Sequence, residues 1–116
     1  MKDIDIARKY TAKFDNASHN GIYFDLSLTS YKNMCRAKKC KLTGITLTDK
    51  SGPNLKASDR TIDRIDATKG YVEGNCMAVC HRANQFKADF ENGNRTLDVK
   101  HAEMILRFMR KHNLAN

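Results

Sequence analysis

The chain has 116 residues, 41% of them hydrophobic and 29% charged, and a formal net charge of +8. This length suits a single domain over residues 1–116, and no apolar stretch approaches the roughly 20 residues that a membrane span requires. Acids at Asp3 and Asp5 stand where a secretory signal peptide is first basic and then apolar, so we expect a soluble, intracellular protein.

The 21 Lys and Arg side chains outnumber the 13 Asp and Glu side chains. Such an excess favours a polyanionic partner, because basic side chains release the counterions condensed on phosphates; a merely solubilising surface is the alternative. No helix pairs a broad apolar face with a basic one, which argues against a membrane surface as the partner. The densest basic cluster comprises Lys32, Arg36, Lys38, Lys39 and Lys41.

A first helix is predicted over residues 4–14, where Ile6, Tyr10 and Phe14 recur every four residues. The turn-forming residues 15–21 should end this helix.

Ser27 is the predicted N-cap of a second helix, because apolar residues follow it at helical spacing. These apolar residues are Leu28, Tyr31, Met34 and Cys35. The basic cluster falls at the C-terminal end of this helix, where cations suit the helix dipole.

The middle of the chain is predicted to form strands. Residues 45–48 suggest a short strand, followed by a surface loop over 49–59. Residues 60–66 alternate and are rich in β-branched side chains, which is typical of a strand. A loop over 67–75 leads to another short strand at 76–79.

Two helices are predicted to close the chain. The pattern turns helical from about 80 to 90, and a last helix starts at Thr96 or Asp98 as its cap. We expect this helix to bury one apolar stripe. The stripe consists of Val99, Ala102, Ile105 with Leu106, and Met109. The order of elements predicts an α+β domain.

Two oxygen-bearing side chains point to metal chemistry. Asp63 lies on a predicted strand and Asn84 one turn into the following helix, so a hairpin packed on that helix brings them together. Hard oxygen ligands suit Mg²⁺ or Mn²⁺. One such ion would neutralise the charge on a scissile phosphate. A plain surface ion pair of Asp63 with Arg60 or Arg82 is the alternative.

Residues 40–87 resemble the HNH family of ββα-metal nucleases, in a small phage-type form. The resemblance rests on Cys-Lys-Leu-Thr-Gly at 40–44, Asp-Arg-Ile at 63–65, Gly-Asn at 74–75 and Cys-His-Arg-Ala-Asn-Gln-Phe-Lys at 80–87. It implies a ββα-metal (HNH, or His-Me finger) core with flanking N- and C-terminal helices.

The resemblance also implies boundaries and ligands. The core would span about 40–90, after a helical extension over 1–39 and before a C-terminal helix over about 96–113. Asp63 and Asn84 would hold the single Mg²⁺ or Mn²⁺ ion.

Further roles carried over from the family fall on residues around that pair. Asn75 would pin the hairpin loop, and Lys87 would contact a phosphate. The sequence departs from the family at Arg64, which stands where the general-base histidine is usual and cannot accept a proton near neutral pH. Arg64 could clamp the phosphate instead. The base would then be Asp66, His81 or metal-bound water.

The four cysteines have two interpretations. Members of the family with structural zinc use paired cysteines flanking the motif, so Cys35, Cys40, Cys76 and Cys80 could form a Zn²⁺ site. Four residues separate Cys35 from Cys40 and three separate Cys76 from Cys80, and both spacings are unusual for zinc. Separate buried thiols are therefore favoured over a structural Zn²⁺ ion.

These features together predict a metal-dependent, HNH-type endonuclease that hydrolyses phosphodiester bonds in DNA, in the host cytoplasm if a phage encodes it. The alternative is a catalytically impaired nucleic-acid-binding or anti-defence accessory protein of a phage on the same scaffold, and a zinc-stabilised interaction module is a third option. Tyr71 either stacks on a base or covers the hairpin. The predicted nucleic-acid contacts are Lys38, Lys39, Lys41, Arg60, Arg82 and Lys87.

Overall fold

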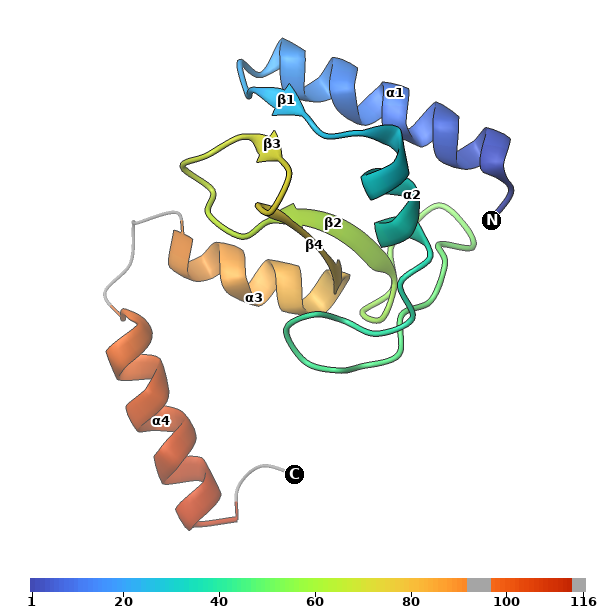
Figure 1. Ribbon diagram of the computed structural model, residues 1–116. Helices are drawn as coiled ribbons and strands as arrows, with labels where there is room; N and C mark the ends of the chain where they lie inside the picture. The colour runs from blue at the N-terminus through green and yellow to red at the C-terminus, as the bar shows by residue number, and fades with distance from the viewer. Residues whose placement is uncertain (92–96, 114–116) are drawn as a thin grey trace. The chain divides into compact units, whose positions relative to one another are not determined.

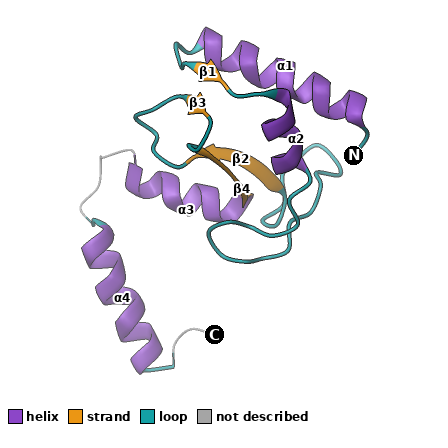
Figure 2. Cartoon of the chain, in the orientation of Figure 1, coloured by secondary structure: helices purple, strands orange, loops and turns teal. Residues whose placement is uncertain are grey.

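The computed structural model describes residues 1–91 and 97–113. This part of the chain contains both helices and short strands (Figures 1 and 2). The elements are α1 (Asp3–His19), β1 (Phe24–Asp25), α2 (Leu28–Cys35), β2 (Arg60–Arg64), β3 (Tyr71–Val72), β4 (Cys76–Cys80), α3 (His81–Glu91) and α4 (Val99–Lys111). The mixture of helices and small sheets confirms the α+β class.

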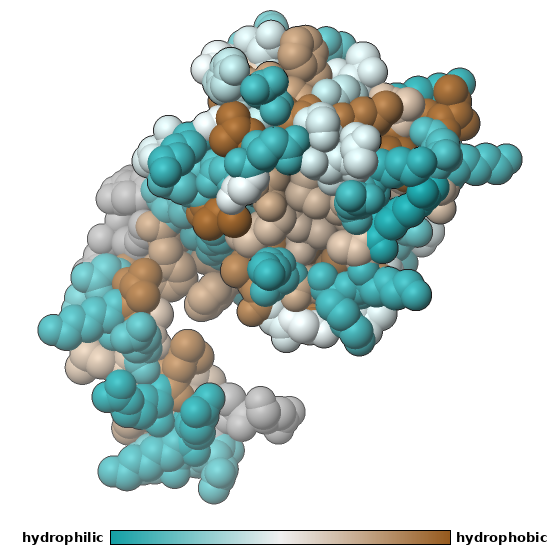
Figure 3. Space-filling model, in the orientation of Figure 1, coloured by the Kyte–Doolittle hydropathy of each residue, from teal (hydrophilic) through white to brown (hydrophobic). Residues whose placement is uncertain are grey.

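The chain divides into two compact units, Met1–Gln85 and Phe86–Asn116. Neither unit contains, within its described residues, a helix with the length and apolar character needed to cross a bilayer. On the face drawn in Figure 3, hydrophilic side chains surround smaller hydrophobic areas.

The first helix is longer than its sequence pattern predicts. The predicted end at residues 15–21 is wrong, because α1 continues to His19. Ala17 is buried and anchors the last turn against the rest of the first unit. The chain reverses only at Gly21, whose φ of 69° is a left-handed conformation that glycine adopts without strain.

The predicted cap of α2 is confirmed. The Ser27 side chain accepts a hydrogen bond from the Ser30 N–H at 3.1 Å, which satisfies one of the open donors of the first turn. Glu73 lies on the same turn from the other side: its carboxylate accepts from the Ser27 N–H at 3.1 Å and from the Ser30 hydroxyl at 2.7 Å. These bonds fasten the hairpin to the start of α2, and they hold the pKa of Glu73 below its ordinary value.

Two small sheets organise the first unit. Strands β2 and β4 pair antiparallel, with Arg60 opposite Cys80 and Arg64 opposite Cys76. Strands β1 and β3 pair parallel, with Phe24 opposite Tyr71. The second pairing was not predicted.

The predicted strand at 45–48 is not formed. Its residues make only isolated bridges, from Thr46 to Lys39 and from Thr48 to Asp59. Ile45 and Leu47 form backbone bonds with residues 38–40, and Thr48 forms them with residues 58–60, so the segment changes partner after a few residues and neither pairing extends into a strand.

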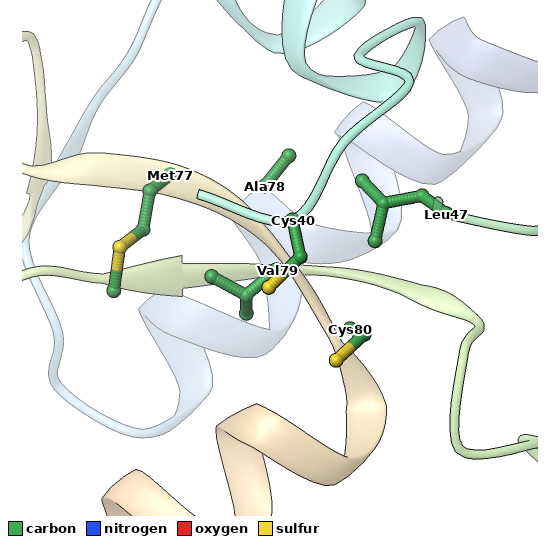
Figure 4. Packing of buried hydrophobic residues seen from close by; sticks show 6 residues of the cluster. All are labelled: Cys40, Leu47, Met77, Ala78, Val79 and Cys80. Carbon is green, nitrogen blue, oxygen red and sulfur yellow. The ribbon is translucent and has the colours of Figure 1, made fainter. Parts of the chain in front are cut away.

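Two hydrophobic clusters form the core of the first unit. Figure 4 shows the first, which consists of Cys40, Leu47, Met77, Ala78, Val79 and Cys80. The second joins α1 to α2 and consists of Ile6, Leu26, Tyr31 and Cys35. Met34 and Ile62 pack against both clusters, so α2 and β2 tie the two together.

Of the two predicted caps of α4, Asp98 is the observed one, and Thr96 lies outside the described residues. The apolar stripe of this helix is not buried. Asp98 accepts from the His101 N–H at 3.1 Å and completes a capping box. Val99, Ile105 and Leu106 are 57%, 46% and 54% exposed. Neither α3 nor α4 contains a buried residue, so the described part of the second unit supplies no core for this stripe.

Candidate active site

Asp63 and Asn84 line the same pocket, which has a volume of about 390 Å³. Asp63 comes from β2, and Asn84 comes from the first turn of α3, which begins at His81 immediately after β4. Because β4 pairs with β2 and runs directly into α3, the helix starts beside the strand that carries Asp63. One carboxylate oxygen of Asp63, Oδ2, is shielded from solvent.

The chemistry of these two side chains fits a divalent ion. A carboxylate and a carboxamide oxygen are hard ligands, and a pocket that stays partly open leaves room for water and a phosphate oxygen, as Mg²⁺ and Mn²⁺ require. Asp63 and Asn84 are both half-buried. Partial burial raises the strength of an ion–carboxylate interaction above its value in water.

Basic side chains contribute much of the remaining wall of this pocket. Lys9 and Lys13 come from α1, Lys50 from the loop before β2, and Arg60 from the start of β2. Asp49 is the other acid at the wall. The balance of charge around Asp63 is therefore positive and suits a phosphate-bearing ligand.

Arg60 connects separate segments of the first unit through hydrogen bonds and an ion pair. Its Nε and Nη2 donate to the Ala37 carbonyl oxygen at 3.1 and 2.6 Å, and Nη1 pairs with the Asp49 carboxylate. Its side chain is only 12% exposed. Most donors of this guanidinium already have protein acceptors. Few of them are left for the nucleic-acid contact that the sequence predicts for Arg60.

Arg64 closes the hairpin loop. Its Nη1 donates to the carbonyl oxygens of Ala67 and Lys69 at 2.8 and 2.9 Å. The guanidinium carbon lies 5.3 Å from the centre of the Tyr71 ring, and Lys13 Nζ lies 4.8 Å from the same centre. Tyr71 therefore covers the hairpin and holds two cations.

Asn75 lies inside this loop and is 7% exposed. Its Oδ1 accepts from the Asp66 N–H at 3.0 Å, and its Nδ2 donates to the carbonyl oxygens of Asp66 and Gly70 at 3.1 and 2.9 Å. Both ends of the amide are used, so Asn75 fixes the loop between β2 and β3.

The two side chains predicted as general bases are Asp66 and His81. The Asp66 carboxylate accepts from the Thr68 N–H at 2.9 Å and from the Thr68 hydroxyl at 2.6 Å, which is a local turn motif. His81 starts α3, and its backbone N–H donates to the Asp59 carbonyl oxygen at 2.8 Å. The pocket that contains Asp63 is lined by neither Asp66 nor His81.

The basic cluster predicted from the sequence lies on a different surface. Lys38, Lys39 and Lys41 are exposed. Lys39 and Lys41 line a second pocket, of about 340 Å³, that does not include Asp63. Lys39 Nζ donates to the Thr46 hydroxyl at 2.7 Å.

The remaining predicted contacts are on α3. Arg82 is exposed, and its backbone N–H donates to the Ala57 carbonyl oxygen at 3.0 Å. Lys87 pairs with Glu91 at 2.5 Å, one turn along the helix.

The cysteines fall into two places. Cys40 and Cys80 belong to one core cluster, whereas Cys35 belongs to the other and Cys76 packs against it. All four are free thiols. Residues 1–91 and 97–113 contain no group of three or more His, Cys, Asp or Glu side chains that could hold a metal ion.

The thiols also differ in acidity. Burial raises the pKa of Cys40, but donors from the Thr43 side chain and from the backbone of Cys80, Leu42 and Thr43 outweigh it, and the pKa falls to about 7. Burial raises the pKa of Cys35 and of Cys76 above the ordinary thiol value.

Comparison of the chain with protein-family models, with curated proteins and with solved structures found no match.

Sequence reasoning missed Lys9 and Lys13. Their positions in the sequence could have indicated them. Lys9 follows Ile6 by three residues and Lys13 follows Tyr10 by three, so both lysines border the apolar stripe of α1 instead of facing away from it.

Proposed function

We propose that the chain is a divalent-metal-dependent endonuclease that hydrolyses phosphodiester bonds in DNA on a ββα-metal core made of β2, β4 and α3. One observation carries the proposal: Asp63 and Asn84, from separate elements, line one pocket whose wall is otherwise rich in basic side chains. Metal ligands and phosphate-binding cations are the two components that phosphodiester hydrolysis requires.

In this proposal Asp63 and Asn84 hold the ion, and the neighbouring cations bind the substrate. When bound, Mg²⁺ or Mn²⁺ supplies positive charge to the scissile phosphate and to the leaving oxygen. Asp63 supplies the only negative charge of the pair, so it contributes most of the ion affinity. Lys13 and Lys50, which line the same pocket, orient the phosphate.

The proton of the attacking water needs a separate route. Arg64 cannot accept it, since a guanidinium stays protonated at any physiological pH. Asp66 and His81 do not line the pocket, so we expect solvent to take the proton. A rate that rises with pH, without a plateau near the ordinary histidine value of about 6.5, agrees with this route.

The test is nicking of supercoiled plasmid with Mg²⁺ or Mn²⁺, with and without a chelator. Asp63→Ala should abolish nicking and Mn²⁺ binding, and Asn84→Ala should weaken both less, because a neutral amide contributes less than a carboxylate. Asp15→Ala is the matched control, since Asp15 is an exposed acid of α1 outside the pocket. Full activity of Asp63→Ala would end the assignment.

A second candidate is a nucleic-acid-binding accessory protein on the same scaffold that does not catalyse. The two backbone bonds of Arg64 favour it, because they give this residue a structural use in place of a base. Binding of DNA without nicking of duplex, single-stranded or branched substrates, with either ion, would establish the accessory function.

A further inference from the structure

We infer that the phosphate backbone of the substrate lies across the α1 side of the Asp63 pocket and is bound there by Lys9 and Lys13, which lie outside the HNH-like motif. This inference rests on the proposed function, because it names the substrate surface of that same site. It moves the main phosphate contacts from the sequence-predicted cluster at Lys38, Lys39 and Lys41 to the N-terminal helix.

The positive charge of Lys9 and Lys13 favours phosphate binding at the α1 side of the pocket. Lys9 and Lys13 line the pocket. Within residues 1–91 and 97–113, neither forms an ion pair. Arg60, another cation of the wall, is neutralised by its ion pair with Asp49. Among the described residues, the side-chain cations of the wall without an ion pair are therefore Lys9, Lys13 and Lys50, and two of the three lie on α1.

The Lys13 side chain is held in place before a phosphate binds. Lys13 Nζ lies over the Tyr71 ring at 4.8 Å. That ring is fixed by the parallel pairing of β1 with β3, in which the Tyr71 N–H donates to the Tyr23 carbonyl oxygen at 2.8 Å. A lysine already held in place loses less side-chain entropy when a phosphate binds.

The spacing of Lys9 and Lys13 on α1 is compatible with the spacing of phosphates along a DNA strand. Lys9 and Lys13 are four residues apart on one helix, so their attachment points are separated by about 6 Å along the axis. They project from the same face. A strand with one phosphate per roughly 3.4 Å of duplex axis presents two phosphates within reach of such a pair.

The pocket lined by Lys39 and Lys41 does not contain the proposed metal ligands Asp63 and Asn84. Lys39 and Lys41 line their pocket with Ala37 and Met77. A strand bound only there would be attached to a pocket that does not contain Asp63.

The experiment compares two variants that remove equal charge. Lys9→Gln/Lys13→Gln and Lys39→Gln/Lys41→Gln are titrated with a short fluorescent DNA duplex in chelator, over a series of salt concentrations. Loss of two phosphate contacts should lower the log–log salt slope by about 1.8 in the first variant, and the second variant should lose less than half of that. Chelator keeps the assay independent of metal and of cleavage.

A slope in the Lys9→Gln/Lys13→Gln protein within about 0.5 of the wild-type value, or a larger loss in the Lys39→Gln/Lys41→Gln protein, overturns the inference. Lys9→Arg/Lys13→Arg keeps both charges and should keep the slope, which separates lost charge from a damaged fold. Failure of the proposed function looks different: the wild-type protein would nick no substrate, while its salt slope would still depend on Lys9 and Lys13.

Discussion

Asn75 and Asp66 are joined in both directions: the Asp66 N–H donates to Asn75 Oδ1 at 3.0 Å, and Asn75 Nδ2 donates to the Asp66 carbonyl oxygen at 3.1 Å. A third bond, to the Gly70 carbonyl oxygen at 2.9 Å, spans the rest of the loop. One buried amide thereby binds three backbone groups of the loop between β2 and β3.

Replacing this amide should destabilise the protein. Asn75→Ala leaves three backbone groups without their side-chain partner, and at about 1 kcal/mol each the free energy of unfolding should fall by about 2–4 kcal/mol. Asn75→Asp keeps the acceptor but loses both donated bonds. Urea unfolding measures the change, and a loss below about 0.5 kcal/mol in Asn75→Ala would show that water replaces the amide.

Arg64 offers a test that separates stability from catalysis. Arg64→His loses the bonds to the Ala67 and Lys69 carbonyl oxygens, so its melting temperature should fall. Position 64 does not line the Asp63 pocket, so the nicking rate of Arg64→His should stay close to that of Arg64→Ala. A gain of roughly 10²–10⁴ would show that an imidazole at this position can act as the base. Arg64→Ala is the control that loses the same bonds without gaining a base. An inactive Arg64→His beside an active wild-type protein would assign the arginine a positive role in the reaction.

Gly70 is needed for close approach of two backbones. A Cβ at this position would stand 2.4 Å from the Tyr23 carbonyl oxygen, which belongs to the segment entering β1. Gly70→Ala should therefore push β3 away from β1 and cost about 1–3 kcal/mol, the usual cost of overpacking. Lys69→Ala, an exposed neighbour, is the control. Thermal unfolding of both variants measures the difference, and equal midpoints would show that the two strands separate without cost.

Cys40 should make stability depend on pH. Its pKa of about 7 in the folded chain lies below the ordinary thiol value, so its contribution is present above that ordinary value and is lost as the pH falls through about 7. The free energy of unfolding of the wild-type protein, relative to Cys40→Ala, should therefore rise between about pH 7 and pH 9.

Cys35 and Cys76 act in the opposite sense, because their pKa values are raised. Their contribution is present below the ordinary thiol value and is lost as the pH rises beyond it. Cys35→Ala should accordingly remove part of the loss of stability at alkaline pH. A difference between wild type and Cys40→Ala that does not change with pH would contradict the assigned acidity of Cys40.

Local signals in the sequence were enough for the elements with strong periodicity or caps. Ser27 and Asp98 cap α2 and α4 as predicted, and the alternating run that contains Asp63 forms β2. These features depend on neighbouring residues only, which is why a sequence reveals them.

Features that depend on tertiary contacts were not predictable in this way. Strands β1 and β3 are two residues long, too short for any periodic pattern. The helical end at His19 depends on the burial of Ala17. The lysines of the pocket escape notice because their importance comes from Asp63, which lies far away along the chain.

The parallel pairing of β1 with β3 has a consequence for folding order and for truncation. It is reinforced by the bond from the Ser27 N–H to the Glu73 carboxylate, which joins positions 46 residues apart. Contacts of such long range form late, since the loop between them must close first. A fragment limited to residues 40–90 would lose the partner of β3 and bare the side of Ile62 that faces the second cluster. The segment that carries the nuclease-like motif should therefore fail to fold as an autonomous piece, and its activity should appear only after the N-terminal helix has docked.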